Sequence, residues 1–379
     1  MKVSGDWLER PETQAVCAAL AGAGHQALLV GGCVRNALFG LPVADVDIAT
    51  DATPETVCDL AARAGLKAVP TGIDHGTITV VAGHVPHEVT TFRRDVETFG
   101  RHATVAFSTD VAEDAARRDF TMNALYATAD GTVIDPLGGL PDLHARHVRF
   151  VGDPHARIAE DYLRILRFFR FHALYGDAAR GLDPEALAAC AAHAEGLDTL
   201  SRERIGAEMR KLLAAPDPGP ALAAMDQSGI LARVLPGASA RALPVLVHLE
   251  DGRPPVWLRR LAVLGGGDAA DRLRLSRSEA SHLATLTEAI ASLQGPAELG
   301  YRHGADAASD ILLARAALIG SALPEGWRHA VETGAKAVFP VRAADLMPAL
   351  AGPDLGRRLA ALEARWIASG FTLGRDDLI

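Results

Sequence analysis

The residue pattern changes near position 158, and this change constrains the fold more than any other feature of the sequence. Before it, short runs rich in β-branched residues, such as GTITVVAG and HEVTTF, alternate with helix-like segments such as PETQAVCAALAGAG. After it, alanine, leucine and arginine dominate, and the Gly/Pro-rich stretches APDPGP and EDGRPP divide segments of helical length. The pattern predicts an α+β head with a small mixed sheet, followed by an all-helical remainder.

Composition narrows the class of protein. A chain of 379 residues with 49% hydrophobic residues is long enough for more than one packed unit. It has no apolar run of membrane-spanning length, no secretory pattern at MKVSGDWLERPE, and four cysteines without CxxC spacing. These features predict a cytoplasmic protein without a membrane or an evident protein partner. The net charge of −9 disfavours indiscriminate nucleic-acid binding but leaves room for a local basic cleft.

Two local segments carry specific predictions. Thr53 lies directly before the helix-like run PETVCDLAARAG and is expected to cap it. The polar stretch RRDVETFGRHATVAFSTDV lacks a regular pattern and is predicted to be a mobile loop.

A pair of aspartates gives the first chemical signal. Asp45 and Asp47 stand at i and i+2 of the run ADVDIAT, so on a strand both carboxylates would project from one face. Like charges held this close favour a cation between them, and oxygen ligands suit Mg²⁺. The alternative is a solvated strand end. Glu88, in the later run HEVTTF, is a candidate third carboxylate or an ordinary surface residue.

A glycine turn and short helix, Gly31 to Arg35, end ten residues before this pair. Gly31-Gly32 ends an apolar strand and begins a short helix that carries Arg35. Glycines let the backbone approach a phosphate closely, and a helix N-terminus offers unpaired N–H groups. Arg35 would add a charge-assisted contact to a triphosphate. Strand, turn, helix and aspartate pair together predict a site for a nucleoside triphosphate beside metal ions.

These segments and four later ones resemble one known family. VGGCVRNALFGLPVADVDIAT is similar to the signature of class II tRNA nucleotidyltransferases and bacterial poly(A) polymerases, which belong to the polymerase-β-like superfamily. The later matching segments keep the family's order: RRDFTMNALY, VIDPLGGLPDL, EDYLRILRFFRF and SRERIGAEMRKLL. The resemblance covers roughly residues 25–235. It implies a catalytic head at 1–150, a helical neck at 151–215, and a tRNA-binding body and tail at 216–379.

The resemblance also implies what the residues do. Asp45 and Asp47 would bind the catalytic Mg²⁺ ions, with Glu88 as a further catalytic candidate, while CTP or ATP is joined to the 3′ end of tRNA. The residues expected to bind the nucleotide are Gly32, Arg35, Arg118, Asn123, Asp161, Arg164, Arg167 and Arg170. Asn123 is expected to face the sugar, whereas Arg167 and Arg170 would meet phosphates or the RNA end.

Asp161 and Arg164 suggest a way to choose a base. At i and i+3 of a predicted helix they would share one face. A carboxylate accepts and a guanidinium donates, so the pair fits the amino and ring-nitrogen edge of cytosine or adenine. Guanine and uracil would leave both contacts unpaired, at about 1–3 kcal/mol per group. The alternative is an ordinary surface pair. Leu163, Leu166 and Phe169 recur at helical spacing and are predicted to be core.

Several activities remain open at the level of sequence. The principal prediction is addition of C, C and A to tRNA. A poly(A) polymerase is less consistent with LKAVPTGIDHGTITVVAG, which lacks a basic, aromatic-containing stretch. A CC-adding specialist is less consistent with the full-length segment before RRDFTMNALY. An A-adding specialist and a non-catalytic RNA- or nucleotide-binding relative are the remaining alternatives.

Overall fold

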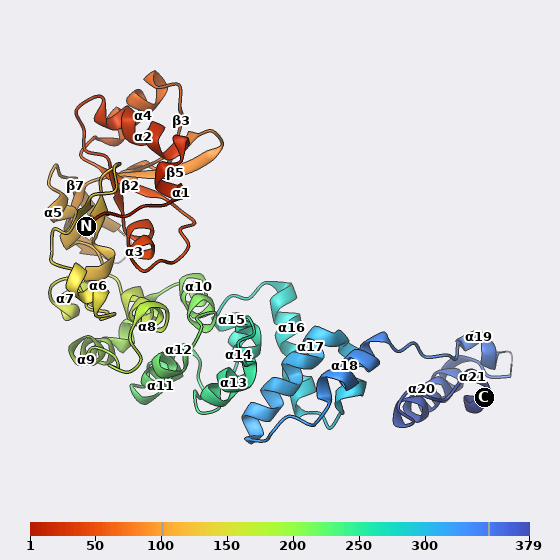
Figure 1. Cartoon of the computed structure of the whole chain (residues 1–379). Coiled ribbons are helices and arrows are strands. Elements are labelled where there is room, and N and C mark those ends of the chain that lie inside the picture. The colour runs from red at the N-terminus through yellow and green to blue at the C-terminus, as the bar shows by residue number, and fades with distance from the viewer. Residues whose placement is uncertain (100–101, 348) are drawn as a thin grey trace. The chain divides into compact units, whose positions relative to one another are not determined.

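The chain divides into two compact units in the computed structural model, which describes residues 1–99, 102–347 and 349–379 (Figure 1). Unit 1 contains Met1–Leu212 and Pro220–Val234, and unit 2 contains Leu213–Gly219 and Leu235–Ile379. The expected division at 1–150, 151–215 and 216–379 stays a prediction.

Unit 1 holds a seven-stranded mixed sheet in the order β3-β4-β5-β2-β1-β8-β9. Neighbouring strands are antiparallel except for the parallel pair β2 and β5. The strands are β1 (Leu28–Val30), β2 (Asp47–Thr50), β3 (Lys67–Gly72), β4 (Thr77–Ala82), β5 (Val85–Thr91), β8 (Tyr126–Ala127) and β9 (Val133–Ile134). The β-branched runs in the sequence therefore form one sheet, as predicted.

Helices cover this sheet and continue beyond it. Helix α2 (Pro11–Ala21) and the amphipathic helix α4 (Pro54–Arg63) pack on each other and on β4 and β5. Thr53 caps α4 by accepting from the Thr56 N–H. The other helical elements of unit 1 are α1 (Asp6–Glu9), α3 (Gly32–Leu38), η1 (Ile73–His75), α5 (Val111–Ala116), η2 (Thr121–Asn123), α6 (Leu140–His144), α7 (Pro154–Glu160), α8 (Leu163–Tyr175), α9 (Pro184–Ala192), η3 (Ala194–Thr199), α10 (Arg202–Leu213), α11 (Gly219–Gln227) and α12 (Ile230–Val234).

The segment predicted to be a mobile loop has regular structure in its described part. Strands β6 (Arg93–Phe99) and β7 (His102–Phe107) pair as a separate antiparallel sheet, while Gly100 and Arg101 lie outside the described residues. The prediction was wrong because valine, threonine and phenylalanine recur there among polar residues, a composition typical of strands. A register shift between Asp95 and Glu97 interrupts the alternation and obscured it in the sequence.

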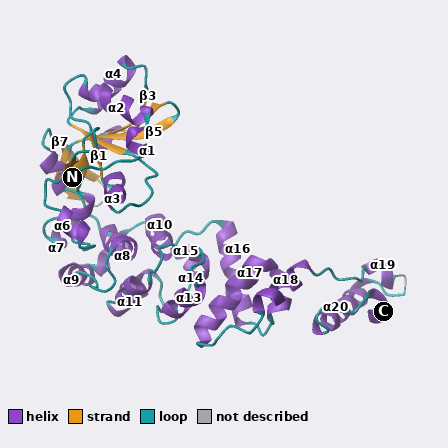
Figure 2. Cartoon of the chain, in the orientation of Figure 1, coloured by secondary structure: helices purple, strands orange, loops and turns teal. Residues whose placement is uncertain are grey.

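The regular elements of unit 2 are helices joined by loops, and no strand follows β9 in the part of the chain that the structure describes (Figure 2). Its helices are α13 (Leu243–Glu250), α14 (Trp257–Leu264), α15 (Ala269–Arg272), α16 (Arg277–Ala291), α17 (Pro296–Ile319), α18 (Trp327–Lys336), α19 (Ala343–Leu346), α20 (Gly352–Ala368) and α21 (Arg375–Leu378). The predicted change from an α+β head to a helical remainder is confirmed. None of the described helices combines the length and the apolar character that a bilayer crossing requires.

A buried ion network lies inside unit 2. Glu250 accepts from Arg259 and Arg260, and Asp310 also accepts from Arg259. Arg260 donates to the carbonyl oxygens of Leu213 at 2.7 Å and Pro216 at 3.0 Å. Buried charges are tolerated only when paired and hydrogen-bonded, and here the two arginines and their two carboxylates satisfy one another.

Candidate active site

A tight turn at Gly31 brings three candidate segments together. Gly31 follows β1 with φ = 70°, a conformation that favours glycine, and its N–H donates to the Leu125 carbonyl. A Cβ atom at this position would lie 3.5 Å from Nη1 of Arg118 and 3.8 Å from Oδ1 of Asn123. Gly32 starts α3 directly after the turn. The structure therefore places the glycine turn beside Arg118 and Asn123.

The two aspartates occupy different backbone environments. Asp47 is the first residue of β2, paired with Val30 of β1 and Glu88 of β5, whereas Asp45 lies two positions earlier in an exposed loop. The prediction that both belong to one strand was wrong, because β1 turns away at Gly31 and its pairing with β2 ends at Asp47. The parallel pairing, which the sequence did not reveal, puts Glu88 directly opposite Asp47.

Negative charge at this edge is poorly balanced. Burial raises the pKa of Asp47 to about 6, the charges of Glu88 and Asp45 act in the same direction, and Arg118 opposes them. We call Asp45, Asp47 and Glu88 the acidic edge. Within the described residues, no three His, Cys, Asp or Glu side chains are grouped closely enough to form a metal-binding cluster. A cation there would be held by an aspartate pair rather than by a ready-made three-residue ligand set.

Arg35 is buried beneath the turn. Its guanidinium donates to Oδ1 of Asn123 at 2.6 Å and to the Tyr175 hydroxyl at 2.8 Å, and it lies 4.1 Å from the centroid of the Tyr175 ring. Burial lowers the pKa of Arg35. These contacts hold α3 against α8. The predicted contact between Arg35 and a triphosphate stays a prediction.

Arg118 keeps its place through the buried residue Asp114. Asp114 accepts from Arg118 at 2.9 Å, from Arg117 at 2.7 Å and from the Tyr126 hydroxyl at 2.7 Å. Burial alone would raise the pKa of Asp114, but the charges of Arg118 and Arg117 outweigh burial and lower it. Arg118 is therefore a fixed positive charge beside both the glycine turn and Asp47.

Asp119 organises the next layer, and sequence reasoning passed over it. Its carboxylate accepts from Nε of Arg167 at 2.7 Å and from Nδ2 of Asn123 at 3.0 Å. Burial alone would raise the pKa of Asp119, but the charge of Arg167 and these hydrogen bonds lower it to about 2. We call Asp119, Asn123, Arg35 and Arg167 the Asp119 network. The sequence signal for Asp119 was its place inside the motif RRDFTMNALY, directly after Arg118.

The proposed base-reading pair differs from its predicted geometry. Asp161 has extended backbone angles and lies between α7 and α8, so it shares no helix with Arg164. Its carboxylate caps α8 at the Leu163 N–H and accepts from Arg204 at 2.6 Å. The prediction of one continuous helix was wrong because Asp161 competes with the helical backbone as a cap.

Arg164 joins the start of α8 to the end of α5. Its guanidinium donates to Glu160, to the Arg157 carbonyl at 2.7 Å and to the Arg117 carbonyl at 3.1 Å. The last contact lies one residue from Arg118. The beginning of α8 is thus tied to the segment that carries Arg118.

The remaining residues of α8 divide between core and ion pairs. Leu163, Leu166 and Phe169 are buried, which confirms their prediction as core. Arg170 is buried as well and donates to Glu208 of α10 at 2.5 Å. In this structure Arg167 and Arg170 are bound to carboxylates, and their predicted contact with phosphates or RNA stays a prediction.

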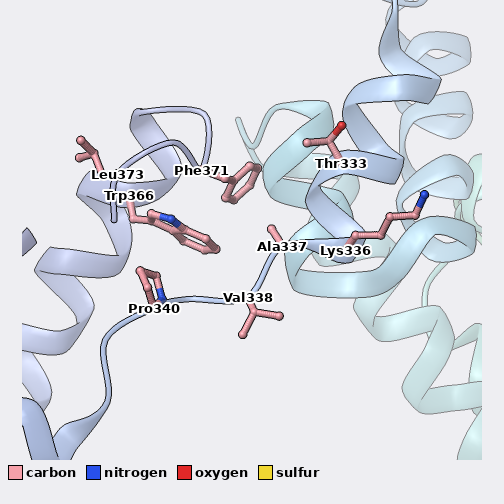
Figure 3. A pocket seen from close by; sticks show the side chains of 8 residues that line it. All are labelled: Thr333, Lys336, Ala337, Val338, Pro340, Trp366, Phe371 and Leu373. Carbon is pink, nitrogen blue, oxygen red and sulfur yellow. The ribbon is translucent and has the colours of Figure 1, made fainter. Parts of the chain in front are cut away.

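Unit 2 contains a cavity that none of the predicted residues lines. Its volume is about 510 Å³, and the Trp366, Phe371 and Pro340 side chains face Thr333 and Ala337 across it (Figure 3). Its lining residues are Thr333, Lys336, Ala337, Val338, Pro340, Trp366, Phe371 and Leu373. The predicted nucleotide-binding residues all lie in unit 1.

Comparisons with known proteins show which proteins this chain resembles. Residues 27–149 match the poly A polymerase head domain, and residues 181–241 match the probable RNA and SrmB- binding site of polymerase A. The human mitochondrial CCA tRNA nucleotidyltransferase 1 is 45% identical over 190 residues, covering 50% of this chain and 44% of that protein. The CCA-adding enzyme of Lacticaseibacillus paracasei is 44% identical over 197 residues, covering 52% and 48%. The chain is thus similar to CCA-adding enzymes and poly(A) polymerases over its head and the segment at 181–241.

Solved structures of the family extend the likeness over most of the chain. The CCA-adding enzyme of Bacillus stearothermophilus in complex with CTP is 29% identical with a TM-score of 0.76, covering 94% of this chain and 92% of that one. The Thermotoga maritima CCA-adding enzyme is 18% identical with a TM-score of 0.72, which shows the shared fold. The matched region spans about half the length of the curated relatives.

Proposed function

We propose that the chain adds C, C and A to the 3′ end of tRNA from CTP and ATP without a template, releasing pyrophosphate. The observation that carries the proposal is Asp47 held beside Glu88 and Asp45 with only Arg118 opposing their charge, next to the turn at Gly31. Relatives that match the same head are named CCA-adding enzymes. We keep a cytoplasmic location as a prediction.

The acidic edge fits a divalent cation by its charge. Asp47 and Asp45 offer carboxylate oxygens, which suit Mg²⁺. Burial, then the charge of Glu88 and finally that of Asp45 raise the pKa of Asp47, so a cation here would relieve the crowding of negative charge. A bound Mg²⁺ supplies positive charge that stabilises the developing oxyanions at the reacting phosphate. Asp45 and Asp47 would hold it, while Glu88 would add negative potential from the neighbouring strand.

The remaining residues would orient the substrates. The 3′-hydroxyl of the RNA attacks the α-phosphorus and loses its proton, and the bond to pyrophosphate breaks. Gly32 and Arg118 would line the path of the triphosphate, because the glycine turn lies beside Arg118. Such catalysis depends on positioning and electrostatics rather than on covalent chemistry by the protein.

Nucleotide choice is assigned to the start of α8. Asp161 and Arg164 each have protein partners here, so reading a base edge requires that these contacts exchange for contacts with the base. The complementary donor and acceptor types still favour cytosine and adenine. Arg204, the partner of Asp161, becomes part of this proposal because it controls whether the carboxylate is available.

The test is direct. Purified chain is incubated with Mg²⁺, CTP, ATP and a tRNA that lacks its terminal CCA, and the products are resolved at single-nucleotide resolution. Sequential addition of C, C and A supports the proposal. Long A tails, addition of C alone, addition of A alone, or no incorporation would identify a poly(A) polymerase, a CC-adding specialist, an A-adding specialist or a non-catalytic relative, respectively.

A further inference from the structure

Two arginines in unit 2 face the same tryptophan ring. The guanidinium of Arg253 lies 5.2 Å from the centroid of Trp327, and that of Arg328 lies 5.4 Å from it. Arg253 belongs to the loop between α13 and α14, whereas Trp327 and Arg328 begin α18. We call Arg253 and Arg328 the arginine pair. They come from segments more than seventy residues apart in the sequence, so the fold brings them together.

Neither arginine has a carboxylate partner. Among residues 1–99, 102–347 and 349–379, no side chain forms an ion pair with Arg253 or Arg328. Burial lowers the pKa of Arg253, and the positive charges of Arg328 and Arg259 lower it further. The negative charges of Asp251 and Asp310 act in the opposite direction. The nearby Arg259 differs, since Glu250 and Asp310 neutralise it. The arginine pair thus concentrates positive charge that no ion pair of the described residues neutralises, while the charges of Asp251 and Asp310 act on Arg253 without contacting it as partners.

The aromatic platform leaves the hydrogen-bond donors available. A guanidinium attracted to a ring face keeps its N–H groups in its own plane, where they can bind two oxygens of one phosphate. Arg328 is exposed and Arg253 half-buried, while Trp327 is only 8% exposed. The loop is also restrained, because Pro254 and Pro255 follow Arg253, and the Arg253 N–H donates to the Glu250 carbonyl at 3.0 Å. Arg253 is therefore held in place beside the ring, and Arg328 reaches the same ring from the exposed start of α18.

We propose that Arg253 and Arg328, held on Trp327, bind the phosphate backbone of the RNA substrate. The inference rests on the proposed function for the identity of the RNA. Phosphate oxygens match the planar donor edges, and backbone contacts fix the position of a nucleic acid without reading its sequence. Phosphate oxygens are also present in free phosphate and in CTP, so the experiment must separate these sources.

The experiment measures binding of tRNA lacking CCA, without turnover, over a series of salt concentrations. A plot of log association constant against log salt concentration has a negative slope, and Arg253→Gln and Arg328→Gln are each expected to make that slope less steep by about 0.9. This change weakens binding about 8-fold at about 0.1 M salt. The double variant should lose about twice the slope. The matched control is Arg302→Gln, which removes the same charge from an arginine already bound to Glu298 at 2.7 Å. Its slope should stay at the wild-type value.

Kinetics and small ligands complete the test. The variants should raise KM for tRNA while kcat, KM for CTP, and binding of CTP and inorganic phosphate stay unchanged. Wild-type tRNA affinity in the double variant, an equal loss in Arg302→Gln, or a loss confined to CTP or phosphate would each overturn the inference. If a Gln variant unfolds, Arg253→Lys and Arg328→Lys replace it in the test. Each Lys variant keeps the charge, so the salt dependence should stay the same while the affinity for tRNA falls. Unchanged affinity would contradict a contact with two phosphate oxygens.

The two proposals can fail separately. Wild-type protein that binds tRNA through the arginine pair but adds no nucleotide would refute the proposed function alone. Wild-type protein that adds CCA while the double variant binds tRNA normally would refute the arginine pair alone.

Discussion

The acidic edge and the Asp119 network lie in the same unit, yet they treat charge in opposite ways. Asp119 is buried and accepts from Arg167 and Asn123, so its pKa falls to about 2. Asp47 has no such partner among the described residues, so burial, together with the charges of Glu88 and Asp45, raises its pKa to about 6. A neutralised charge stabilises the fold, whereas an unbalanced one is kept for a ligand. Substitution of individual aspartates therefore separates neutralised from unbalanced charges.

The largest effect is expected from Asp47→Asn. Loss of this carboxylate should lower nucleotide transfer at least about 10³-fold, because charge stabilisation at the reacting phosphate depends on it. Primer-extension assays at saturating CTP and tRNA measure this directly. Activity within ten-fold of wild type would remove Asp47 from the catalytic site.

The same variant tests the sign of the charge. The folded-state pKa of Asp47 is raised, so ionisation costs stability, and this cost is absent below about pH 4 and complete above about pH 6. Asp47→Asn should therefore unfold at a higher temperature than wild type at pH 7 and at the same temperature near pH 4. Added Mg²⁺ should raise the melting temperature of the wild type and leave that of the variant unchanged.

Asp119→Asn should have the opposite effect on stability. Removing the charge leaves Arg167 without its partner and costs about 3 kcal/mol, measured as a lower urea midpoint at pH 7. The folded pKa of Asp119 is depressed, so this stabilisation is present above about pH 4 and disappears as the pH falls towards 2. A variant as stable as wild type at pH 7 would show that the network is not structural.

Asp161→Ala should give a smaller and more specific change. Asp161 is half-buried, accepts from the Leu163 N–H and is bound to Arg204, so its loss should cost about 1 kcal/mol of stability. Discrimination of CTP and ATP against GTP and UTP should fall about 10-fold, the effect of one lost buried hydrogen bond. Single-nucleotide incorporation rates provide the measurement. Arg204→Ala is the companion variant, and unchanged selectivity in Asp161→Ala would refute the base-reading role.

The smallest effect is expected at an exposed pair. Asp354→Asn removes the partner of Arg357, and both side chains are largely exposed. The free energy of unfolding should change by less than about 1 kcal/mol, because water and salt screen such pairs. Urea unfolding beside Asp119→Asn gives a matched comparison of the same chemical change. An equal loss in both variants would contradict the distinction between buried and exposed pairing.

Local residue patterns determined much of this protein. The β-branched runs, the capped helix at Thr53 and the change to helical composition are short-range features, and the structure confirms them. The glycine turn before α3 was likewise readable because it lies within a few residues, whereas the expectation that Asp45 and Asp47 share one strand was wrong. The hairpin at β6 and β7 was missed because a register shift hides strand alternation.

Only the tertiary structure decided which charges are neutralised. Arg35 and Asn123 are 88 residues apart, Arg167 and Asp119 are 48 apart, and Asp161 and Arg204 are 43 apart. The parallel pairing of Glu88 with Asp47 likewise depends on strand order. Electrostatic energy depends on distance and burial in space, so residues of the same type become structural ion pairs or ligand-binding groups according to the fold.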